Sequence, residues 1–329
     1  MNDTVILTFT YPLIEPYFED FLKSCETQTN KEFDIIIVND GLTSLQSMID
    51  CHPSLNVFIK DYKGTISENR IYGLNLAKQK EYKYVILADS DDFFSANRVQ
   101  KTKDLLSKYE IVANEFDLVN INGEELVTNY ISHRLKNGII IGFEFIKEKN
   151  VIGFSNSAFR AGLIPEKLSI PQDVAVVDWF FYTLLLHAGH KAVFSNEMIT
   201  YYRQYSDNMI GINNETLDNY KKKLALKAMH YRYLSSSFTE FEELAKKYSK
   251  EKKLTDIQVS TLLQNNKIIY HDITLVSSLL CSDCYYNDKK NNLHKYIIAK
   301  CGRDIYFISK VSTVIILTFL QFFFALIIK

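Results

Sequence analysis

Four consecutive residues, Asp89-Ser90-Asp91-Asp92, place three carboxylates and one hydroxyl in a single short segment. Carboxylate oxygens are ligands that Mg²⁺ and Mn²⁺ prefer, and these ions usually also take phosphate oxygens of a substrate. A cation held there would offset the charge of a diphosphate and stabilise it as a leaving group. An Asp-x-Asp triplet also occurs in ordinary surface turns, so the elements around it decide between the two interpretations.

The acidic segment follows an uninterrupted apolar run, Tyr84–Ala88, which predicts a buried strand. A second polar group, Asn39-Asp40-Gly41, follows another apolar run at residues 34–38. Further strands are predicted at residues 5–10, 55–59 and 116–122, and helices at residues 17–25 and 67–80. Apolar strands that alternate with helices predict an α/β fold with a parallel sheet covered on both faces. Because ligands bind beyond the carboxyl ends of such strands, we expect the two polar groups at one edge.

A series of short motifs runs in a fixed order between residues 4 and 212. Its members are Cys25–Thr29 with Phe33-Asp34, Val38–Gly41, Glu68–Arg70 with Gly73–Asn75 and Ala77, Tyr84–Asp92, Gly153–Arg160, Val177–Trp179 with Ala188-Gly189, and Tyr202–Tyr205 with Asn208 and Gly211. Together they resemble the motif series of family 2 glycosyltransferases of the bacterial surface-glycan type. The ordered series is far more specific than any one of its members.

The resemblance implies a GT-A fold, which is a Rossmann-like α/β sheet that binds a nucleotide-diphospho-sugar. It implies a hexosyl-type transferase that moves the sugar to an acceptor hydroxyl with inversion at the anomeric carbon, in one direct displacement. It also implies a divalent metal cofactor, Mn²⁺ or Mg²⁺, bound through the DXD motif.

The resemblance assigns roles on the donor side of the site. Thr8 would lie where the first strand meets the nucleotide, and Asp40 would accept a hydrogen bond from the base, commonly uracil. Arg70 would lie close to the nucleotide.

The resemblance assigns a separate role to each residue of the acidic segment. Asp89 would lie near the ribose, Ser90 would belong to the nucleotide-sugar site, and Asp91 would bind the metal. Asp92 is expected only to cap the following helix.

On the acceptor side, the resemblance makes Asp178 the general base that takes the proton of the attacking hydroxyl. A carboxylate at the start of a helix is also favoured by the helix dipole, and the two interpretations are compatible. Asn156 and Trp179 are assigned to the acceptor side. Trp179, the single tryptophan, either stacks on an acceptor sugar or packs in the core.

The sequence departs from the family pattern in two places. The first strand continues as Thr8-Phe-Thr-Tyr-Pro12 where the family usually has a Thr-Tyr-Asn-like turn. Tyr205 stands where the final motif often carries a histidine. Because a phenol is a poor ligand for these metals at neutral pH, we expect the metal to be held mainly by Asp91 and the diphosphate.

The carboxyl end of the chain contains an uncharged apolar run, Val311–Ile328. Eighteen helical residues span roughly 27 Å, about the thickness of a bilayer core. The run therefore predicts a spanning anchor, an interfacial helix or a soluble core helix, with membrane attachment favoured. Lys300, Arg303 and Lys310 precede it and would keep the body of the protein on the cytoplasmic face of the plasma membrane. The start at Met1–Thr4 has no basic segment, so no signal peptide is expected.

These features suggest a division of the chain. We expect a GT-A domain over residues 1–212, with donor binding in 1–115 and the acceptor side in 116–212. A helical extension over 213–310 and the membrane-associated segment at 311–328 would follow. The formal net charge of -1 gives no electrostatic argument for a nucleic acid partner.

Two further possibilities concern metal and function. Cys281, Cys284, His294 and Cys301 supply four potential zinc ligands, but their spacing matches no common zinc finger. The leading function is a glycosyltransferase that builds surface polysaccharide or lipooligosaccharide. The alternatives are a nucleotidyltransferase, although residues 8–16 hold neither the glycine nor the lysine of a phosphate loop, and a non-catalytic membrane-attached binding protein with a degenerate site.

Overall fold

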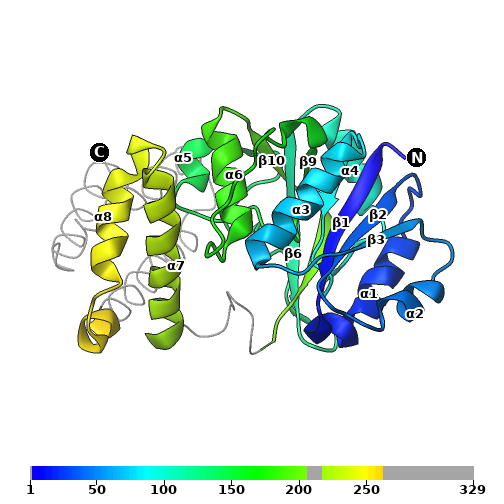
Figure 1. Cartoon of the computed structure of the whole chain (residues 1–329), viewed down its shortest axis with the longest axis horizontal. Helices are drawn as coiled ribbons and strands as arrows, with labels where there is room; N and C mark the ends of the chain where they lie inside the picture. Colours follow the sequence, from blue (N-terminus) through cyan, green and yellow to red (C-terminus); the bar gives the residue numbers. More distant parts are fainter. Residues whose placement is uncertain (1, 206–216, 262–329) are drawn as a thin grey trace, which may run out of the picture. The chain divides into compact units, whose positions relative to one another are not determined.

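The computed structural model describes residues 2–205 and 217–261 (Figure 1). Residues 1–215 and 222–252 form one compact unit, and residues 216–221 belong with those from Lys253 onward to a second. The first unit holds the sheet, its covering helices and most of the first two helices that follow. The domain limits suggested by the sequence, at residues 212 and 310, stay predictions.

One mixed sheet of ten strands organises the first unit, in the order β3-β2-β1-β4-β9-β6-β10-β5, with β7 on β6 and β8 on β10. The four strands that open the chain are parallel to one another, whereas β9 lies antiparallel between β4 and β6. The strands are β1 Thr4–Thr10, β2 Asp34–Asn39, β3 Val57–Asp61, β4 Tyr84–Leu87, β5 Phe93–Phe94, β6 Ile111–Val119, β7 Glu125–Val127, β8 Ile140–Ile141, β9 Ser157–Arg160 and β10 Ala192–Arg203.

Helices cover both faces of this sheet (Figure 1). The helices of the described residues are α1 Glu15–Glu26, α2 Leu45–Asp50, α3 Ile66–Gln79, α4 Arg98–Leu106, α5 Phe143–Ile146, α6 Val177–His187, α7 Leu217–Ser235 and α8 Glu242–Glu251. Apolar side chains of α1, α2 and α4 pack with Ile6, Ile35 and Ile86 in one core cluster. On the opposite face, α3 lies against β1 and β2 and also contacts α6.

The parallel α/β core predicted from the apolar runs is confirmed, with each predicted strand and helix of the first 90 residues within two residues of its observed limits. The parallel pairing holds for β1 to β4, and the sheet becomes mixed where β9 enters it in the antiparallel sense. The strand predicted at residues 116–122 begins earlier, as β6 at Ile111. Six or more consecutive buried residues in β1 and β2 explain why those strands carry an uninterrupted apolar pattern.

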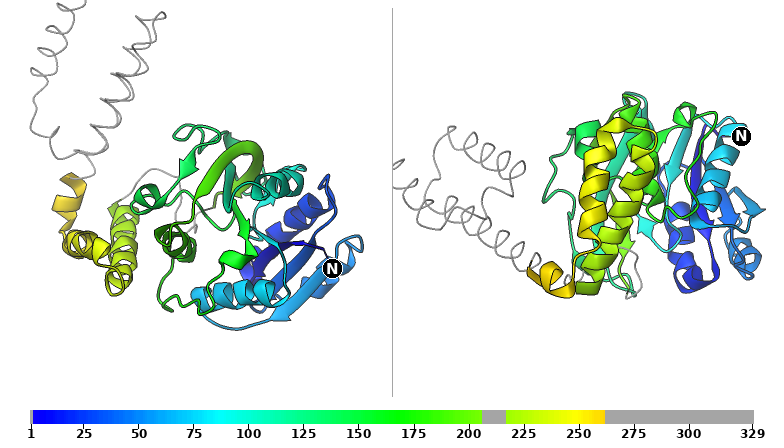
Figure 2. Two further views of the ribbon diagram at one scale, coloured as in Figure 1. Left: turned by 90° about the horizontal axis from the view of Figure 1, so that it is seen from above. Right: turned by 60° about the vertical axis from the view of Figure 1, so that its left-hand side comes forward.

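Helices α7 and α8 lie side by side as an antiparallel pair (Figure 2). Tyr231 of α7 stacks on Tyr248 of α8 with ring centroids 5.1 Å apart. Their inner side meets α6, where His230 stacks on Trp179 at 4.0 Å. Within residues 2–205 and 217–261 no helix is long and apolar enough to cross a membrane. The apolar run Val311–Ile328 and the four possible zinc ligands of residues 281–301 lie outside the described residues.

Candidate active site

The carboxyl ends of β1, β2 and β4 bring the two polar groups predicted from the sequence to one edge of the sheet. The backbone N–H of Asp40 donates to the carbonyl of Thr10 at 2.8 Å, which joins the ends of β2 and β1. The hydroxyl of Ser90, in the acidic segment after β4, donates to the carbonyl of Phe9 at 2.6 Å. The last residues of all three strands therefore lie together at the carboxyl edge of the sheet.

Helix α3 supplies Asn69 and Arg70 to this edge. Its start is fixed by a reciprocal pair of bonds, in which the Glu68 N–H donates to the Thr65 hydroxyl and the Thr65 N–H donates to the Glu68 carboxylate. The helix lies so close to β1 that a Cβ on Gly73 would come within 2.8 Å of the Phe9 ring. This close approach explains the glycine of the motif.

Arg70 connects α3 to the acidic segment. Its guanidinium donates to Asp89 at 3.2 Å and lies 3.9 Å from the centre of the Phe9 ring. Surrounding protein desolvates the Asp89 carboxylate, although 30% of its side chain reaches solvent, and raises its pKa to about 6. Arg70 opposes this rise in pKa, while the negative charges of Asp91 and Asp178 add to it. Three carboxylates therefore influence one another across this edge, and the Arg70 guanidinium offsets part of their charge.

Two residues of the acidic segment point into the protein. The buried Ser90 hydroxyl donates to the Phe9 carbonyl. The buried Asp92 carboxylate accepts from the Ser155 hydroxyl and from the Arg203 N–H at 2.8 Å. Burial raises the pKa of Asp92 well above its usual value. The prediction that Asp92 caps the following helix is wrong, because its carboxylate joins the segments before β9 and at the end of β10.

Arg98, the first residue of α4, lies fully buried behind the acidic segment. One guanidinium nitrogen donates to the carbonyls of Leu87 at 2.7 Å and Ser155 at 2.8 Å. Burial lowers its pKa to about 10, while the charges of Asp92 and Asp89 oppose that fall. The sequence analysis missed this residue, since nothing in the spacing of Arg98 marks it as buried.

Asp91 lies at the edge of the sheet, beside the end of β10. The Tyr205 hydroxyl donates to the Asp91 carboxylate at 2.5 Å, and the Arg203 guanidinium donates to the Asp91 carbonyl at 2.9 Å. Tyr205 stacks on Tyr17 with ring centroids 5.8 Å apart, and it also bonds to Tyr11. Within residues 2–205 and 217–261 no group of three His, Cys, Asp or Glu side chains is placed to hold a metal.

Asp40 directly follows the end of β2, whereas Thr8 lies inside β1. The Asn69 amide donates to the Asp40 carboxylate at 3.2 Å, so Asp40 is tied to α3 and partly exposed at the edge. Thr8 is fully buried inside β1, and its hydroxyl has no hydrogen-bond partner among the described residues. The assignment of Thr8 to the nucleotide stays a prediction, and Tyr11 is the residue that β1 delivers to the edge.

Asp178 begins α6 on the other side of the acidic segment. Its carboxylate accepts from the Trp179 N–H at 2.6 Å and from the Asn150 amide at 3.4 Å. Burial raises its pKa. Gly153 faces it so closely that a Cβ there would come within 3.3 Å of the Asp178 carboxylate. The glycine therefore lets the loop backbone lie against this carboxylate, which also accepts a hydrogen bond from the Phe154 N–H.

The amino-terminal half of the chain resembles known proteins in sequence. Residues 3–164 match the model of the glycosyl transferase family 2. These residues form a family 2 glycosyltransferase domain. The dTDP-rhamnosyl transferase RfbG of Shigella flexneri is 23% identical over 241 residues, which are 66% of this chain and 78% of that protein.

Solved structures share the GT-A fold of this glycosyltransferase. TarS residues 1–349 of S. aureus, in complex with UDP-GlcNAc, superpose with a TM-score of 0.54 at 16% identity, over 75% of this chain and 71% of that one. The mannosyltransferase PcManGT of Pyrobaculum calidifontis, with GDP-Man and Mn²⁺, gives a TM-score of 0.52 at 12% identity, over 92% and 87% of the two chains. The predicted fold is thereby confirmed for the α/β part of the transferase.

The two residues assigned to the acceptor side of the glycosyltransferase are buried. The Asn156 amide donates to the Asn114 carbonyl at 2.8 Å and accepts from the Gly153 N–H at 2.7 Å, so it shapes the loop that faces Asp178. The Trp179 indole donates to the Ile146 carbonyl at 2.7 Å, and its ring is 5% exposed. Of the two interpretations of Trp179, packing in the core is confirmed.

Proposed function

We propose that this glycosyltransferase moves a hexosyl-type sugar from a nucleotide-diphospho-sugar to a hydroxyl of a glycan or glycolipid acceptor, with inversion and with the help of Mn²⁺ or Mg²⁺. The observation that carries the proposal is the convergence of Asp89, Asp91 and Asp178 on one edge, with Arg70 bonded to the first of them. A nucleotide-diphosphate brings negative charge, and a cation or guanidinium at this edge would offset it.

The chain's own residues suit separate steps of this reaction. Asp40 and Arg70 would orient the nucleotide, and Asp89 would lie near its ribose. Asp178 would take the proton of the acceptor hydroxyl as that oxygen bonds to the anomeric carbon and the bond to the diphosphate breaks. The raised pKa of Asp178 matches this role, because a more basic carboxylate accepts a proton more readily.

Asp91 is the residue that would hold the divalent metal, together with oxygens of the diphosphate. Its carboxylate fits a hard cation, and one of its oxygens already accepts a hydrogen bond from Tyr205. When bound, the metal would supply Lewis-acid stabilisation of the departing nucleotide. The Tyr205 phenol already shares the charge of the Asp91 carboxylate, so a cation held there would compete with this hydrogen bond.

Replacing Tyr205 by Phe is therefore expected to tighten Mn²⁺ binding by about tenfold, because it removes a charge-assisted hydrogen bond that competes for Asp91. The ring stack on Tyr17 is kept, so the fold around the site should persist. Titration of free Mn²⁺ by electron paramagnetic resonance measures the change without a turnover assay. Tyr17→Phe is the matched control and should bind Mn²⁺ as the wild type does; equal or weaker binding by Tyr205→Phe would contradict the competition.

A UDP-linked donor is proposed from the assignment of Asp40 to the base. TarS has been solved with UDP and with UDP-GlcNAc, whereas PcManGT carries GDP-Man and RfbG is named for dTDP-rhamnose. The relatives therefore differ in nucleotide, and the donor must be found by experiment.

The proposed setting is the cytoplasmic face of the plasma membrane, in the synthesis of surface polysaccharide or lipooligosaccharide. Support comes from the sequence, in which the apolar run Val311–Ile328 follows Lys300, Arg303 and Lys310. A lipid-linked acceptor would suit a transferase held at a membrane.

The deciding experiment incubates the full chain with a panel of UDP-, GDP- and dTDP-sugars, with Mn²⁺, with Mg²⁺ and with chelator. Release of a nucleoside diphosphate from one donor, dependent on the divalent ion, is the expected result. Release of pyrophosphate from a nucleoside triphosphate would favour the nucleotidyltransferase. Binding of a nucleotide-sugar without turnover in any acceptor mixture would favour the non-catalytic protein.

A further inference from the structure

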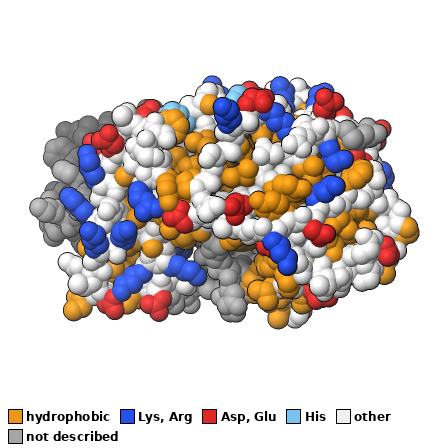
Figure 3. All heavy atoms as spheres, in the orientation of Figure 1, with side chains coloured by type: hydrophobic (Ala, Val, Ile, Leu, Met, Phe, Trp, Pro, Cys, Tyr) orange, Lys and Arg blue, Asp and Glu red, His pale blue; other side chains and the backbone are white. Residues whose placement is uncertain are grey.

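Helices α7 and α8 carry an excess of cations that the rest of the chain lacks. Between Lys222 and Lys252 there are eight Lys and Arg residues against four Asp and Glu residues, in a chain whose formal net charge is -1. Figure 3 shows lysine and arginine side chains gathered over this helical pair. Positive charge is therefore concentrated on one structural feature.

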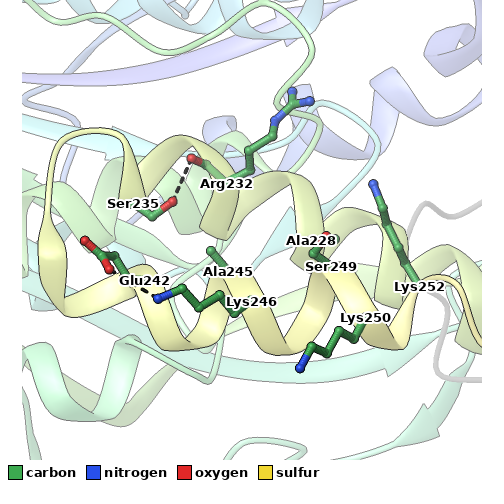
Figure 4. Close-up of a pocket in the computed structure, with 9 residues that line it drawn as sticks. All are labelled: Ala228, Arg232, Ser235, Glu242, Ala245, Lys246, Ser249, Lys250 and Lys252. Carbon is green, nitrogen blue, oxygen red and sulfur yellow. Dashed lines mark hydrogen bonds and ion pairs between the residues drawn. The ribbon is translucent and has the colours of Figure 1, made fainter.

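The two helices enclose a groove of about 580 Å³ (Figure 4). Its cationic lining residues are Arg232, Lys246, Lys250 and Lys252, and its single acidic lining residue is Glu242. Only small side chains, alanine and serine, line the rest of it. The groove therefore offers room between its charges, and no bulky side chain fills it.

Two of the four cationic lining residues pair with carboxylates of the protein itself. Glu242 pairs with Lys246 at 3.5 Å, and Arg232 pairs with Asp173 at 3.2 Å. Lys250 and Lys252 have no carboxylate within 4.0 Å among residues 2–205 and 217–261, and both side chains are largely at the surface. Unpaired cations in a cluster attract an anionic partner and weaken the fold slightly by mutual repulsion.

The pKa of Lys227, on α7 beside the groove, is lowered by its surroundings. Burial lowers its pKa most, the neighbouring charges of Lys247 and Lys223 lower it further, and those of Glu148 and Glu251 oppose the fall. Its amino group lies 5.1 Å from the centre of the Tyr248 ring, which offsets only part of the repulsion. The cluster thus holds more positive charge than its own residues compensate.

The direction of the cationic side chains distinguishes between possible anions. In Figure 4 the side chains of Lys250 and Lys252 extend in different directions from the helical pair, and that of Arg232 extends in a third. A single small anion would touch one of them at a time. The anionic leaflet of a membrane presents many phosphates side by side, so each of the long, flexible cationic side chains on the side that faces it can meet its own phosphate.

We propose that the α7–α8 surface docks this protein on a membrane that contains anionic phospholipid. The cations on the groove rim contact lipid phosphates, and the space between the helices admits headgroups. This docking involves neither the acidic segment nor Asp178. Its value for catalysis rests on the proposed function, because it would hold the transferase beside a lipid-linked acceptor.

The test uses the full chain and sedimentation with two kinds of vesicle, one of phosphatidylcholine alone and one of equal parts phosphatidylcholine and phosphatidylglycerol. We expect at least about tenfold stronger partition into the anionic vesicles, weakened by added salt. Charge reversal in Lys246→Glu/Lys250→Glu/Lys252→Glu should lower that partition by about tenfold or more. Inorganic phosphate at constant ionic strength should compete poorly.

Lys108→Glu/Lys136→Glu/Lys167→Glu is the matched control, since it makes the same change in net charge at three exposed lysines of the α/β part. It should keep partition within about twofold of the wild type. Circular dichroism and nucleotide-sugar hydrolysis without vesicles report folding and the donor site separately, so a failure of the proposed function shows itself apart from a failure of docking. Equal partition into both vesicle types, equal loss in both triple variants, or full displacement by inorganic phosphate would overturn the proposal.

Discussion

Replacing Asp178 by Asn is expected to lower kcat for sugar transfer by about 10² to 10⁴-fold, while the KM for the donor changes little. The carboxylate lies in the first turn of α6, is held by the Trp179 N–H at 2.6 Å, and lies against the loop at Gly153. An amide of the same shape keeps that hydrogen-bonded start of the helix but accepts no proton. Loss of kcat at unchanged donor affinity therefore separates base chemistry from a role in donor binding.

The pH dependence gives a second readout of the same prediction. Burial raises the pKa of Asp178, and the pKa of Asp89 is raised to about 6. Both carboxylates are in their working, ionised form only above their pKa values, so kcat/KM is expected to fall as the pH drops through about 6. If kcat/KM falls only near pH 4, where an ordinary carboxylate titrates, the result would contradict the raised pKa values of these two groups.

Asp173→Asn is the matched control for Asp178. Asp173 lies on the exposed segment just before α6, where it bonds to Arg232 and Tyr233. Its loss should leave kcat within about twofold, as expected of a surface substitution. If Asp178→Asn keeps more than half of the wild-type kcat, Asp178 serves only the start of the helix.

Replacing Asp91 by Asn is expected to remove the stimulation of donor turnover by Mn²⁺ and to lower kcat/KM by about 100-fold or more. Asp91 and Asp89 are both half-buried at the edge, but Asp89 is bonded to Arg70 and Asp92 points inward, so Asp91 is the carboxylate that would take the cation. Calorimetric titration of a nucleoside diphosphate with and without Mn²⁺ measures the change directly. The wild type should bind more tightly with Mn²⁺, and the variant should bind equally in both conditions.

Asp92→Asn separates a metal effect from a folding effect at the neighbouring position. The buried Asp92 carboxylate accepts from the Ser155 hydroxyl and the Arg203 N–H. Its replacement should lower Tm, because one acceptor oxygen becomes an amide nitrogen that faces a donor. Stimulation by Mn²⁺ should persist in the folded fraction. Loss of the Mn²⁺ response in Asp92→Asn but not in Asp91→Asn would show that the roles of the two residues are reversed.

The sequence by itself determined the framework of the donor site. The apolar runs before Asn39 and Asp89 are the buried strands β2 and β4, because a strand covered on both faces must be apolar at every position. Polar groups directly after such strands reach the carboxyl edge whatever the rest of the fold does. Local pattern and chain order therefore place Asp40 and Asp89 together, and the ordered motifs add Arg70 through the family resemblance.

Only the tertiary structure decided which way each side chain points and what it meets. Ser90, Asp92, Asn156 and Trp179 face inward, although each belongs to a motif that carries site residues. Those directions depend on partners far along the chain: Ser155 is 63 residues from Asp92, and Tyr205 is 114 residues from Asp91. A pattern of neighbours along the sequence reports which face of an element is apolar. It does not report which distant hydroxyl, carbonyl or guanidinium the folded chain brings against a given carboxylate, and that choice leaves Asp91 and Asp178 at the edge.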